Sequence, residues 1–352
     1  MNKMRILLVS AVPPPAGGIA TWSLRYLEFC KKHQISVDLV NTALSGERGN
    51  RINSKRKLSD EISRTRRILH DMKQELKNTP DIVHVNSSCS TFGIIRDYMC
   101  IYMAKKRKIP VFFHCHCNIK DQIQKTYGIK ILKKIFNMVS QVWVLNTDSF
   151  NFVKELNAKK VEIVPNFVDE ESLSDIHNIN KEIGEVVFVG HVQPTKGCKE
   201  IYDVARRLPQ VHFRLIGPVN DEIKQLQCPK NVTLEGECSS EQIQQFFSIA
   251  DVFLFPSHTE GFSLSLTEAM ANGLPCIATN VGANKDMIEN QGGIIVPVKD
   301  EKAIVEAFQL IREKETRKKM SVWNINKVRS TYTIEIVMRK IVEMYKRELK
   351  NK

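Results

Sequence analysis

Residues 258–275 read HTEGFSLSLTEAMANGLP, and they follow a continuous apolar run, DVFLFPS, that has the pattern of a buried strand. After this strand we predict a short polar loop and then a helix that begins at about Phe262. Glu260 precedes the helix, and Glu268 lies about two turns into it. A strand, a loop and a helix in this order form the repeating unit of a parallel sheet covered by helices.

The two glutamates stand where a ligand with phosphate and hydroxyl groups could bind. The backbone N–H groups of Gly261, Phe262 and Ser263 have no intrahelical acceptor and could hold a phosphate. Glu268 lies beside AMANGLP, a segment of small residues in which a carboxylate needs a partner. A sugar or ribose diol is a good partner, because a carboxylate accepts two hydroxyl protons at once. As purely structural residues, Glu260 could cap the helix and Glu268 could be exposed.

The same alternation extends along the chain. Strand patterns before residue 166 are MRILLVS, SVDLVN, DIVHVNS, IPVFFHCHC, QVWVLN and VEIVPN, and those after it are VVFVG, VHFRLIG, NVTLEG, DVFLFPS, PCIATN and GGIIVPV. Residues 166–185 are polar and acidic, which suits a linker, and residues 325–349 have the pattern of one long basic helix. We therefore predict an α/β fold with two Rossmann-like, doubly wound parallel-sheet domains, at residues 1–165 and 166–329. Ligands bind at the carboxyl ends of such strands, so the domains are expected to face an interdomain cleft.

Two further loops carry residues suited to phosphate. Gly17 and Gly18 follow the first strand and lead into a helix, where a bare backbone can approach a phosphate closely. A plain turn is the alternative, because the GxGxxG pattern is missing. The loop after VVFVG carries His191 and Lys196, and a helix starts near Gly197. A lysine at a junction of strand, loop and helix suits a phosphate, although a lone lysine is usually solvated.

The segment VFFHCHCNI places two histidines and two cysteines together. Side chains alternate along a strand, so His114 and His116 share one face and Cys115 and Cys117 share the other. These four side chains cannot converge on one zinc ion, and no other Cys/His pair has finger spacing, so no metal site is predicted. We instead interpret a single histidine of this segment as a hydrogen-bond donor in the cleft, and the alternative is a satisfied core histidine.

Composition limits the class of protein. The chain has 352 residues, 42% of them hydrophobic, which is enough for two cores. The chain has no continuous run of roughly 18 apolar residues, so no membrane-spanning helix is predicted. The N-terminal MNKMRILLVSAVPPP is interpreted as a strand and a loop rather than a signal peptide. The nine cysteines include no CxxC pair, which favours reduced, mostly buried thiols in a cytosolic protein.

The net charge of +13 is divided unevenly. Residues 1–165 hold 28 Lys/Arg and 13 Asp/Glu (+15), residues 166–311 hold 11 and 21 (−10), and residues 312–352 hold 13 and 5 (+8). A basic N-terminal half and tail indicate that one half meets an anionic surface, either nucleic acid or a membrane. No zinc finger or RNA-recognition signature supports nucleic acid. We therefore predict an anionic membrane surface as a partner and no nucleic acid.

Several of these segments resemble one enzyme family. EGFSLSLTEAMANGLPCIATNVGANKDMI is similar to the E-x7-E segment of the family 4 glycosyltransferases, which are retaining enzymes of GT-B fold. FVGHVQPTKG, VEIVPNFVD and NVTLEGECSSEQIQQFFSIADVFLFPS resemble the rest of the family's C-terminal domain in order and spacing. RILLVSAVPPPAGGIATW resembles its N-terminal glycine loop, and KIPVFFHCHC resembles its strand ending in a catalytic-site histidine, with His116 at that position. The resemblance covers nearly the whole chain.

The resemblance implies a role for each matched residue. Glu268 would hold the nucleotide ribose, and Glu260 would contact the donor sugar. The donor diphosphate would be held by Lys196, with His191 beside it, and by the backbone amides of Gly261, Phe262, Ser263 and Leu264.

The N-terminal domain would complete the site. His116 would sit by the transferred sugar and Gly18 near the phosphates. His116, Glu260 and Lys196 are thus the predicted catalytic residues. The last helix, at about residues 330–352, would pack back on the N-terminal domain.

Two positions depart from the family pattern. The family usually has an arginine after the strand glycine, where this chain has His191. Arginine is a permanent cation with a fork of donors, whereas histidine is mostly neutral at pH 7. Either Lys196 carries most of the phosphate charge or the bound diphosphate draws a proton onto His191; otherwise activity is weak or needs a partner. Cys117 also stands where many members have an acidic residue.

The leading hypothesis is a retaining glycosyltransferase of hexosyltransferase type. It would move a sugar from a nucleotide-diphosphate sugar to a glycan or lipid-linked acceptor in the synthesis of capsule, exopolysaccharide or O-antigen. We expect it to be cytoplasmic and peripheral on the inner face of the plasma membrane. No cofactor or metal is expected, because the chain has no Asp-x-Asp motif. The alternative is a catalytically impaired GT-B protein that acts as a binding partner in a glycan-assembly complex. A two-carboxylate hydrolase is disfavoured, because both glutamates lie close to helix amides.

Overall fold

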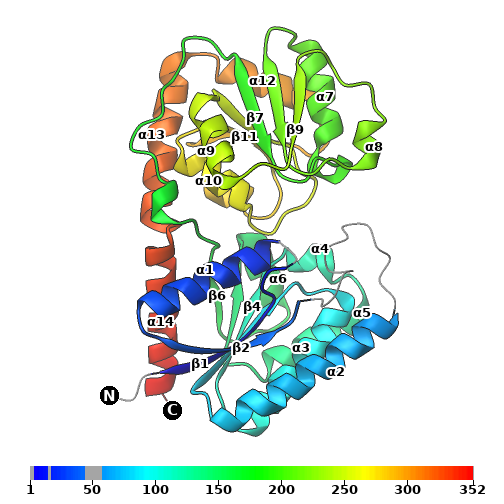
Figure 1. Ribbon diagram of the computed structural model, residues 1–352, viewed down its shortest axis with the longest axis vertical. Coiled ribbons are helices and arrows are strands. Elements are labelled where there is room, and N and C mark those ends of the chain that lie inside the picture. The colour runs from blue at the N-terminus through cyan, green and yellow to red at the C-terminus, as the bar shows by residue number, and fades with distance from the viewer. Residues whose placement is uncertain (1–3, 15–16, 44–57, 352) are drawn as a thin grey trace. The chain divides into compact units, whose positions relative to one another are not determined.

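The computed structural model describes residues 4–14, 17–43 and 58–351. The chain forms two compact units (Figure 1). The first unit runs to Pro165 and also contains the residues from Val337 onward, and the second unit is Asn166–Ile336.

The first unit contains a six-stranded parallel sheet in the order β2-β1-β3-β4-β5-β6. Its strands are β1 (Arg5–Ser10), β2 (Ser36–Asn41), β3 (Ile82–Ser87), β4 (Val111–Cys115), β5 (Gln141–Val144) and β6 (Val161–Ile163). Its helices are α1 (Gly18–Lys32), α2 (Leu58–Glu75), the 3-10 turn η2 (Leu76–Asn78), α3 (Thr91–Lys106), α4 (Ile119–Gln122), α5 (Thr126–Phe136), α6 (Thr147–Glu155) and most of α14 (Ile334–Lys350).

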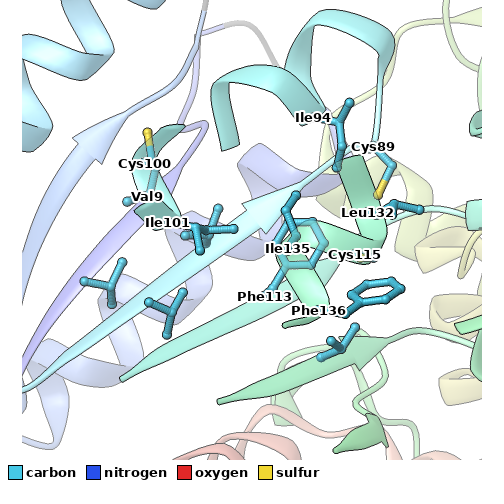
Figure 2. Packing of buried hydrophobic residues seen from close by; sticks show 14 of the residues in the cluster. Val9, Cys89, Ile94, Cys100, Ile101, Phe113, Cys115, Leu132, Ile135 and Phe136 are labelled. Carbon is cyan, nitrogen blue, oxygen red and sulfur yellow. The ribbon is translucent and has the colours of Figure 1, made fainter. Parts of the chain in front are cut away.

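One part of the core of this unit lies between the sheet and a layer of three helices in which α3 packs against both α2 and α5. Figure 2 shows Phe113 and Cys115 of β4 packed with Ile94 of α3 and with Ile135 and Phe136 of α5. The strands have continuous apolar runs because both faces of a parallel sheet are covered by helices. This burial is why the apolar segments alone were sufficient to predict the strands.

The second unit contains another six-stranded parallel sheet, in the order β12-β11-β10-β7-β8-β9. Its strands are β7 (Glu185–Val189), β8 (His212–Ile216), β9 (Val232–Gly236), β10 (Val252–Phe255), β11 (Cys276–Thr279) and β12 (Gly293–Val296). Its helices are η3 (Glu170–Ser172), η4 (Pro194–Lys196), α7 (Cys198–Arg207), α8 (Asp221–Lys224), α9 (Ser240–Ile249), α10 (Leu264–Ala271), α11 (Asn284–Ile288), α12 (Glu301–Leu310) and α13 (Lys314–Thr331).

The strand order reverses at one point in each sheet. In the first sheet β1 lies between β2 and β3, and in the second sheet β7 lies between β8 and β10. Helices leave the sheet in opposite directions at such a point, and this opens a crevice beyond the carboxyl ends of the strands. The two candidate ligand positions are therefore the edge beyond β1 and β3 and the edge beyond β7 and β10.

The prediction of one long C-terminal helix is wrong, and the start of another helix shifts by two residues. The predicted long helix at residues 325–349 is two helices, because α13 ends at Thr331 and α14 begins at Ile334. Backbone pairing with the linker interrupts it: the N–H of Val168 donates to the carbonyl of Tyr332, and the N–H of Ile334 donates to the carbonyl of Val168, both at 2.9 Å. The helix expected from Phe262 begins instead at Leu264, which follows a side-chain cap described below. Among the described residues, no helix combines the length and apolar character needed to cross a bilayer.

Candidate active site

The loops after β7 and β10 meet at the reversal point of the second sheet. Lys196 lies in the loop after β7, and Glu260 lies in the loop after β10. The Lys196 ammonium donates a hydrogen bond to a Glu260 carboxylate oxygen, and only 24% and 11% of these two side chains are exposed. Because Lys196 and Glu260 are 64 positions apart, the sequence alone could not predict this ion pair. It places one cation and one carboxylate together where an open α/β sheet binds its ligands.

Two glycines allow three loops to pack with backbone against backbone. Gly197 has φ +75°, and a Cβ added there would lie 2.1 Å from the carbonyl oxygen of Pro256 at the end of β10. Gly282 lies after β11 with φ +54°, and a Cβ there would lie 2.4 Å from the carbonyl oxygen of Glu260. An L side chain at either position would be strained and would displace the neighbouring loop. The position of Glu260 therefore depends on glycines in the two adjacent loops.

A second polar pair joins the loops after β7 and β10. The N–H of His258 donates to the carbonyl of Thr195 at 3.0 Å, and the His258 ring Nε2 lies 2.8 Å from Oε1 of Glu200 in the first turn of α7. Glu200 is 6% exposed, so its carboxylate is almost fully removed from water. Sequence analysis missed this pair, because neither residue belongs to a pattern that distinguishes it from an ordinary polar residue on the surface. The pair links the segment containing Lys196 to the segment containing Glu260.

The N-terminus of α10 follows directly. The Ser263 hydroxyl accepts a hydrogen bond from the N–H of Leu266 at 3.2 Å, which caps the helix and sets its start at Leu264. Phe262 is buried and packs edge-on against Tyr332, with 5.3 Å between ring centroids. The first N–H groups of a helix have no intrahelical acceptor, so this turn presents donors to a ligand. Glu268 lies in the second turn and is half-buried.

His191 is exposed at the end of β7. The chain after it is held by backbone pairing, since the N–H of Val192 donates to the carbonyl of Pro218 at 3.0 Å and the N–H of Asn220 donates to that of Val192 at 2.9 Å. This pairing fixes the path of the loop while leaving the imidazole at the surface. His191 therefore supplies a side chain at the same strand end as Lys196.

In the first unit, polar side chains connect the carboxyl ends of three strands. His116, directly after β4, lies with its Nε2 3.0 Å from Oδ1 of Asn86 in β3. The Asn86 amide donates to the Ser10 hydroxyl of β1 at 3.0 Å, and that hydroxyl lies 2.6 Å from the Ser23 hydroxyl of α1. Because Asn86 uses its NH2 group toward Ser10, its oxygen faces His116, which places a proton on Nε2. Sequence analysis identified His116 but missed Asn86 and Ser10, whose roles depend on the strand order.

The ring of His116 rests on a buried aromatic cluster. Trp22 of α1 lies 5.1 Å from the His116 ring and His114 lies 4.0 Å from it, measured between centroids. Trp22 lies four positions after Gly18, so the helix that begins at the glycine loop also supports His116. The imidazole is held in place by this packing on one side and by the Asn86 hydrogen bond on the other.

His114 is a core residue. It is fully buried, and its Nε2 lies 3.2 Å from the carbonyl oxygen of Val164. His84 is also fully buried, and its Nδ1 lies 2.6 Å from the Tyr345 hydroxyl of α14. Burial, and secondarily the nearby His116, lowers the pKa of both His84 and His114 well below the usual range. Of the two histidines predicted on this strand face, only His116 therefore reaches the strand end.

The cysteines on the opposite strand face form a separate cluster. The thiols of Cys115 and Cys117 hydrogen-bond to that of Cys89, and these contacts lower the Cys89 pKa. Burial is the larger cause of the raised pKa of Cys115, and the Cys89 contact is the larger cause for Cys117. Neither this cluster nor any other group of three or more His, Cys, Asp or Glu side chains in the described ranges is arranged so that it could hold a metal ion.

Comparison with known proteins places this chain in a family. The family model described as Glycosyltransferase Family 4 matches residues 16–172, and that described as Glycosyl transferases group 1 matches residues 169–326. The chain belongs to glycosyltransferase family 4. Its fold is GT-B, as in sucrose-phosphate synthase from Thermosynechococcus elongatus, which aligns with a TM-score of 0.81 and 16% identity over 99% of this chain and 100% of that one.

Curated relatives of this family 4 protein are similar at low identity. One is described as an uncharacterized 41.2 kDa protein in the cps region of Klebsiella pneumoniae, 28% identical over 65% of this chain and 68% of the relative. Another is the UDP-Gal:alpha-D-GlcNAc-diphosphoundecaprenol alpha-1,3-galactosyltransferase of Escherichia coli, 24% identical over 76% of each chain. For two other relatives the chain spans only about half of their length, 51% and 52%.

The predicted site residues of this family 4 protein fall into two sets. In the second unit, Lys196 and Glu260 are in direct contact, and the segment from Gly261 to Leu264 connects Glu260 to the helix that carries Glu268. In the first unit, Gly18 and His116 lie on elements joined through Trp22.

Proposed function

We propose that this family 4 glycosyltransferase moves a sugar from a nucleotide-diphosphate sugar to a glycan or lipid-linked acceptor, with retention of configuration at the transferred carbon. The observation that carries the proposal is the Lys196–Glu260 pair at the reversal point of the second sheet, immediately before the N-terminus of α10. This arrangement offers a cation and helix amides to an anion and a carboxylate to a hydroxyl group, which are the two chemical parts of a nucleotide sugar.

The donor half of the mechanism is electrostatic. When the bond from the sugar to the diphosphate breaks, negative charge builds on the leaving phosphate oxygens. The Lys196 ammonium and the amides from Gly261 to Leu264 would neutralise that charge, and His191 would add a further donor. Because these groups are held before the ligand arrives, they need little reorganisation as the charge develops. This supply of positive charge is why we propose that no metal cofactor is needed.

The two carboxylates would bind different parts of the donor. Glu268, in the second turn of α10, would accept hydrogen bonds from the ribose hydroxyls. Glu260, which precedes the helix, would contact the sugar beyond the diphosphate. Its contact with Lys196 would keep the ammonium aimed at the phosphate position in the free enzyme.

The first unit would contribute to the sugar end of the reaction. His116 is proposed to donate from Nε2 or to exchange its Asn86 contact for one to the transferred sugar. The backbone at Gly18, at the start of α1, would lie near the phosphates. The Asn86 and Trp22 contacts hold the imidazole in one orientation, which a positioned hydrogen-bonding group requires.

The acceptor is proposed from the relatives. The Escherichia coli relative is named for a diphosphoundecaprenol-linked acceptor, and the Klebsiella pneumoniae relative for a cps region. We therefore propose an acceptor carried on a lipid or on a growing glycan, in the synthesis of a cell-envelope polysaccharide. The enzyme would then act as a peripheral protein at the inner face of the cytoplasmic membrane.

A panel of nucleotide-diphosphate sugars in a thermal-shift assay tests this function. A donor at about 100 times its dissociation constant should stabilise the protein by roughly 2.7 kcal/mol, while free hexoses should have no effect. Donor hydrolysis and transfer to a polyprenyl-diphosphate-linked sugar would then be measured, with Lys196→Met as the control. If no nucleotide sugar stabilises the protein, the proposal is wrong. Stabilisation without hydrolysis or transfer would instead support a catalytically impaired binding partner, which the exposed His191 in place of arginine makes worth testing.

A further inference from the structure

The outward face of α3 is apolar over most of the helix. Its exposed side chains between Thr91 and Ala104 are Phe92 (50%), Ile95 (40%), Met99 (40%) and Tyr102 (44%), and the half-buried Tyr98 and Met103 lie beside them. These positions follow the three- and four-residue spacing of one helix face. Every residue of α3 is described, and none of its exposed side chains before Lys105 is charged.

The charged residues in the middle of this helix point the other way. Arg96 and Asp97 are buried beneath α3 and form an ion pair at 3.2 Å. A surface helix of a soluble protein normally buries its apolar stripe and exposes its polar one. Here α3 is covered on its inner side by the sheet and on its flanks by α2 and α5, yet its outer side still carries aromatic and aliphatic groups. Contiguous exposed apolar side chains of this kind mark a binding surface.

Lysines and an arginine border this face. α3 ends in Lys105 and Lys106, and the adjoining Arg107 and Lys108 are also exposed. The neighbouring helix α5 presents three exposed lysines, Lys130, Lys133 and Lys134, and contains no acidic residue. The border is therefore positive along the end of α3 and along α5.

The lysines and the aromatic groups lie close together. The Lys106 ammonium lies 4.8 Å from the centre of the Tyr102 ring, and Tyr127 at the start of α5 is 41% exposed. Aromatic and aliphatic side chains bordered by Lys and Arg are the combination that binds the interface of an anionic bilayer.

We propose that this α3 face, defined as Phe92, Ile95, Met99 and Tyr102 with the border lysines of α3 and α5, docks on an anionic lipid bilayer. The apolar groups would enter the interfacial region while the lysines contact lipid phosphates. A second copy of the chain fits less well, because a two-fold contact through α3 would bring two positive borders together. This inference rests on the proposed function, because the proposed lipid-linked acceptor is the reason that the enzyme needs a membrane.

The position of the face within the first unit agrees with that role. α3 begins at Thr91, four residues after β3 ends at Ser87, so Phe92 lies near the strand ends that carry Asn86 and His116. A bilayer on this face would lie beside the edge of the sheet at which we propose that sugar transfer occurs. An acceptor anchored in that bilayer would have a short path to His116.

Vesicle co-sedimentation tests the proposal on the full chain. Wild type should bind vesicles of phosphatidylglycerol and phosphatidylcholine, and bind pure phosphatidylcholine much more weakly. A Phe92→Gln/Met99→Gln variant should bind the anionic vesicles at least about ten-fold more weakly, because two groups that enter the interface are lost. Its matched control is Ile249→Gln/Leu310→Gln, which alters two exposed apolar residues of the second unit and should bind as wild type does.

The charge contribution has its own matched pair. Lys130→Gln/Lys133→Gln/Lys134→Gln should weaken binding by about five-fold for each lysine that contacts the surface. The control removes the same charge from three exposed lysines of α13: Lys314→Gln/Lys318→Gln/Lys319→Gln. Equal losses in the α5 and α13 variants would mean that net charge alone drives binding, and the α3 face would be wrong.

Two other results would overturn the proposal. One is equal binding of wild type to neutral and anionic vesicles. The other is that wild type does not bind vesicles but forms dimers, and that the Phe92→Gln/Met99→Gln variant is monomeric. This result would assign the face to a second copy of the chain. Calorimetry with nucleoside diphosphates on the same samples tests the proposed glycosyltransferase function separately from membrane docking, because vesicle binding needs no nucleotide-sugar donor. A thermal unfolding profile like that of wild type shows that each variant is folded.

Discussion

The contact between Lys196 and Glu260 predicts that variants of this pair affect the stability of the protein and its catalytic turnover differently. Lys196→Met leaves the Glu260 carboxylate, 11% exposed, without its ammonium partner. Glu260→Gln keeps an acceptor for Lys196 but removes the charge. The double variant removes both charges, so no charge of the pair is left in a partly buried position. We therefore expect the double variant to lose less stability than the sum of the losses in the two single variants.

The magnitude follows from the burial of the pair. A hydrogen bond between charged groups contributes about 1.5–3 kcal/mol, and the 24% exposure of Lys196 favours the lower half of that range. A coupling of about 2 kcal/mol is therefore expected in a double-mutant cycle. For a unit the size of Asn166–Ile336, about 2 kcal/mol corresponds to roughly 4–8 °C in the unfolding midpoint.

Thermal unfolding of the free enzyme and a sugar-transfer assay would be run on all four proteins. The double variant should recover much of the midpoint lost in Lys196→Met. Its turnover should stay about 100-fold or more below wild type, because the cation for the leaving diphosphate is still missing. Additive losses of stability would show that the two side chains are not coupled. Recovery of turnover with stability would show that Lys196 acts only on folding, and the proposed charge stabilisation would be refuted.

The other predictions concern single positions. His116→Ala should lower turnover by about 100-fold with nucleotide affinity nearly unchanged, and normal turnover in a folded variant would make His116 a core residue only. Glu268→Gln should weaken nucleoside-diphosphate binding by about 1.5–3 kcal/mol in calorimetry, and wild-type affinity would remove its assignment to the ribose. Gly282→Ala should reduce donor affinity and turnover at least about ten-fold, because its Cβ meets the Glu260 loop, whereas Gly236→Ala, at φ +73° with open space around it, is the control for backbone strain alone. The lowered pKa of the buried His84 and His114 keeps both neutral in the folded protein, so below about pH 6.5 the unfolded chain binds more protons than the folded one. The free energy of unfolding should therefore fall from pH 7 to pH 5, by up to about 1.4 kcal/mol per pH unit for each histidine. An unchanged dependence of stability on pH in a folded His114→Gln variant would contradict this.

The sequence by itself was sufficient for the strands and the family. Parallel strands are buried on both faces, so each appears as an apolar run that needs no tertiary information to find. The segment from Glu260 to Glu268 combines a strand end, a loop and a helix start, and its spacing indicated the family before any geometry was known. Helix boundaries were less certain, because the start of α10 depends on the Ser263 cap and the gap before α14 depends on pairing with Val168.

Only the tertiary structure decided which residues act together. The Lys196–Glu260 contact spans 64 positions, and the His116–Asn86 contact spans 30. Both arise because neighbouring strands of a sheet bring together residues that are far apart in the sequence, and strand order is not encoded in any local pattern. The apolar face of α3 was hidden for a related reason: its sequence is apolar around the helix, and only packing against β-strands, α2 and α5 determines which of those side chains are left in water.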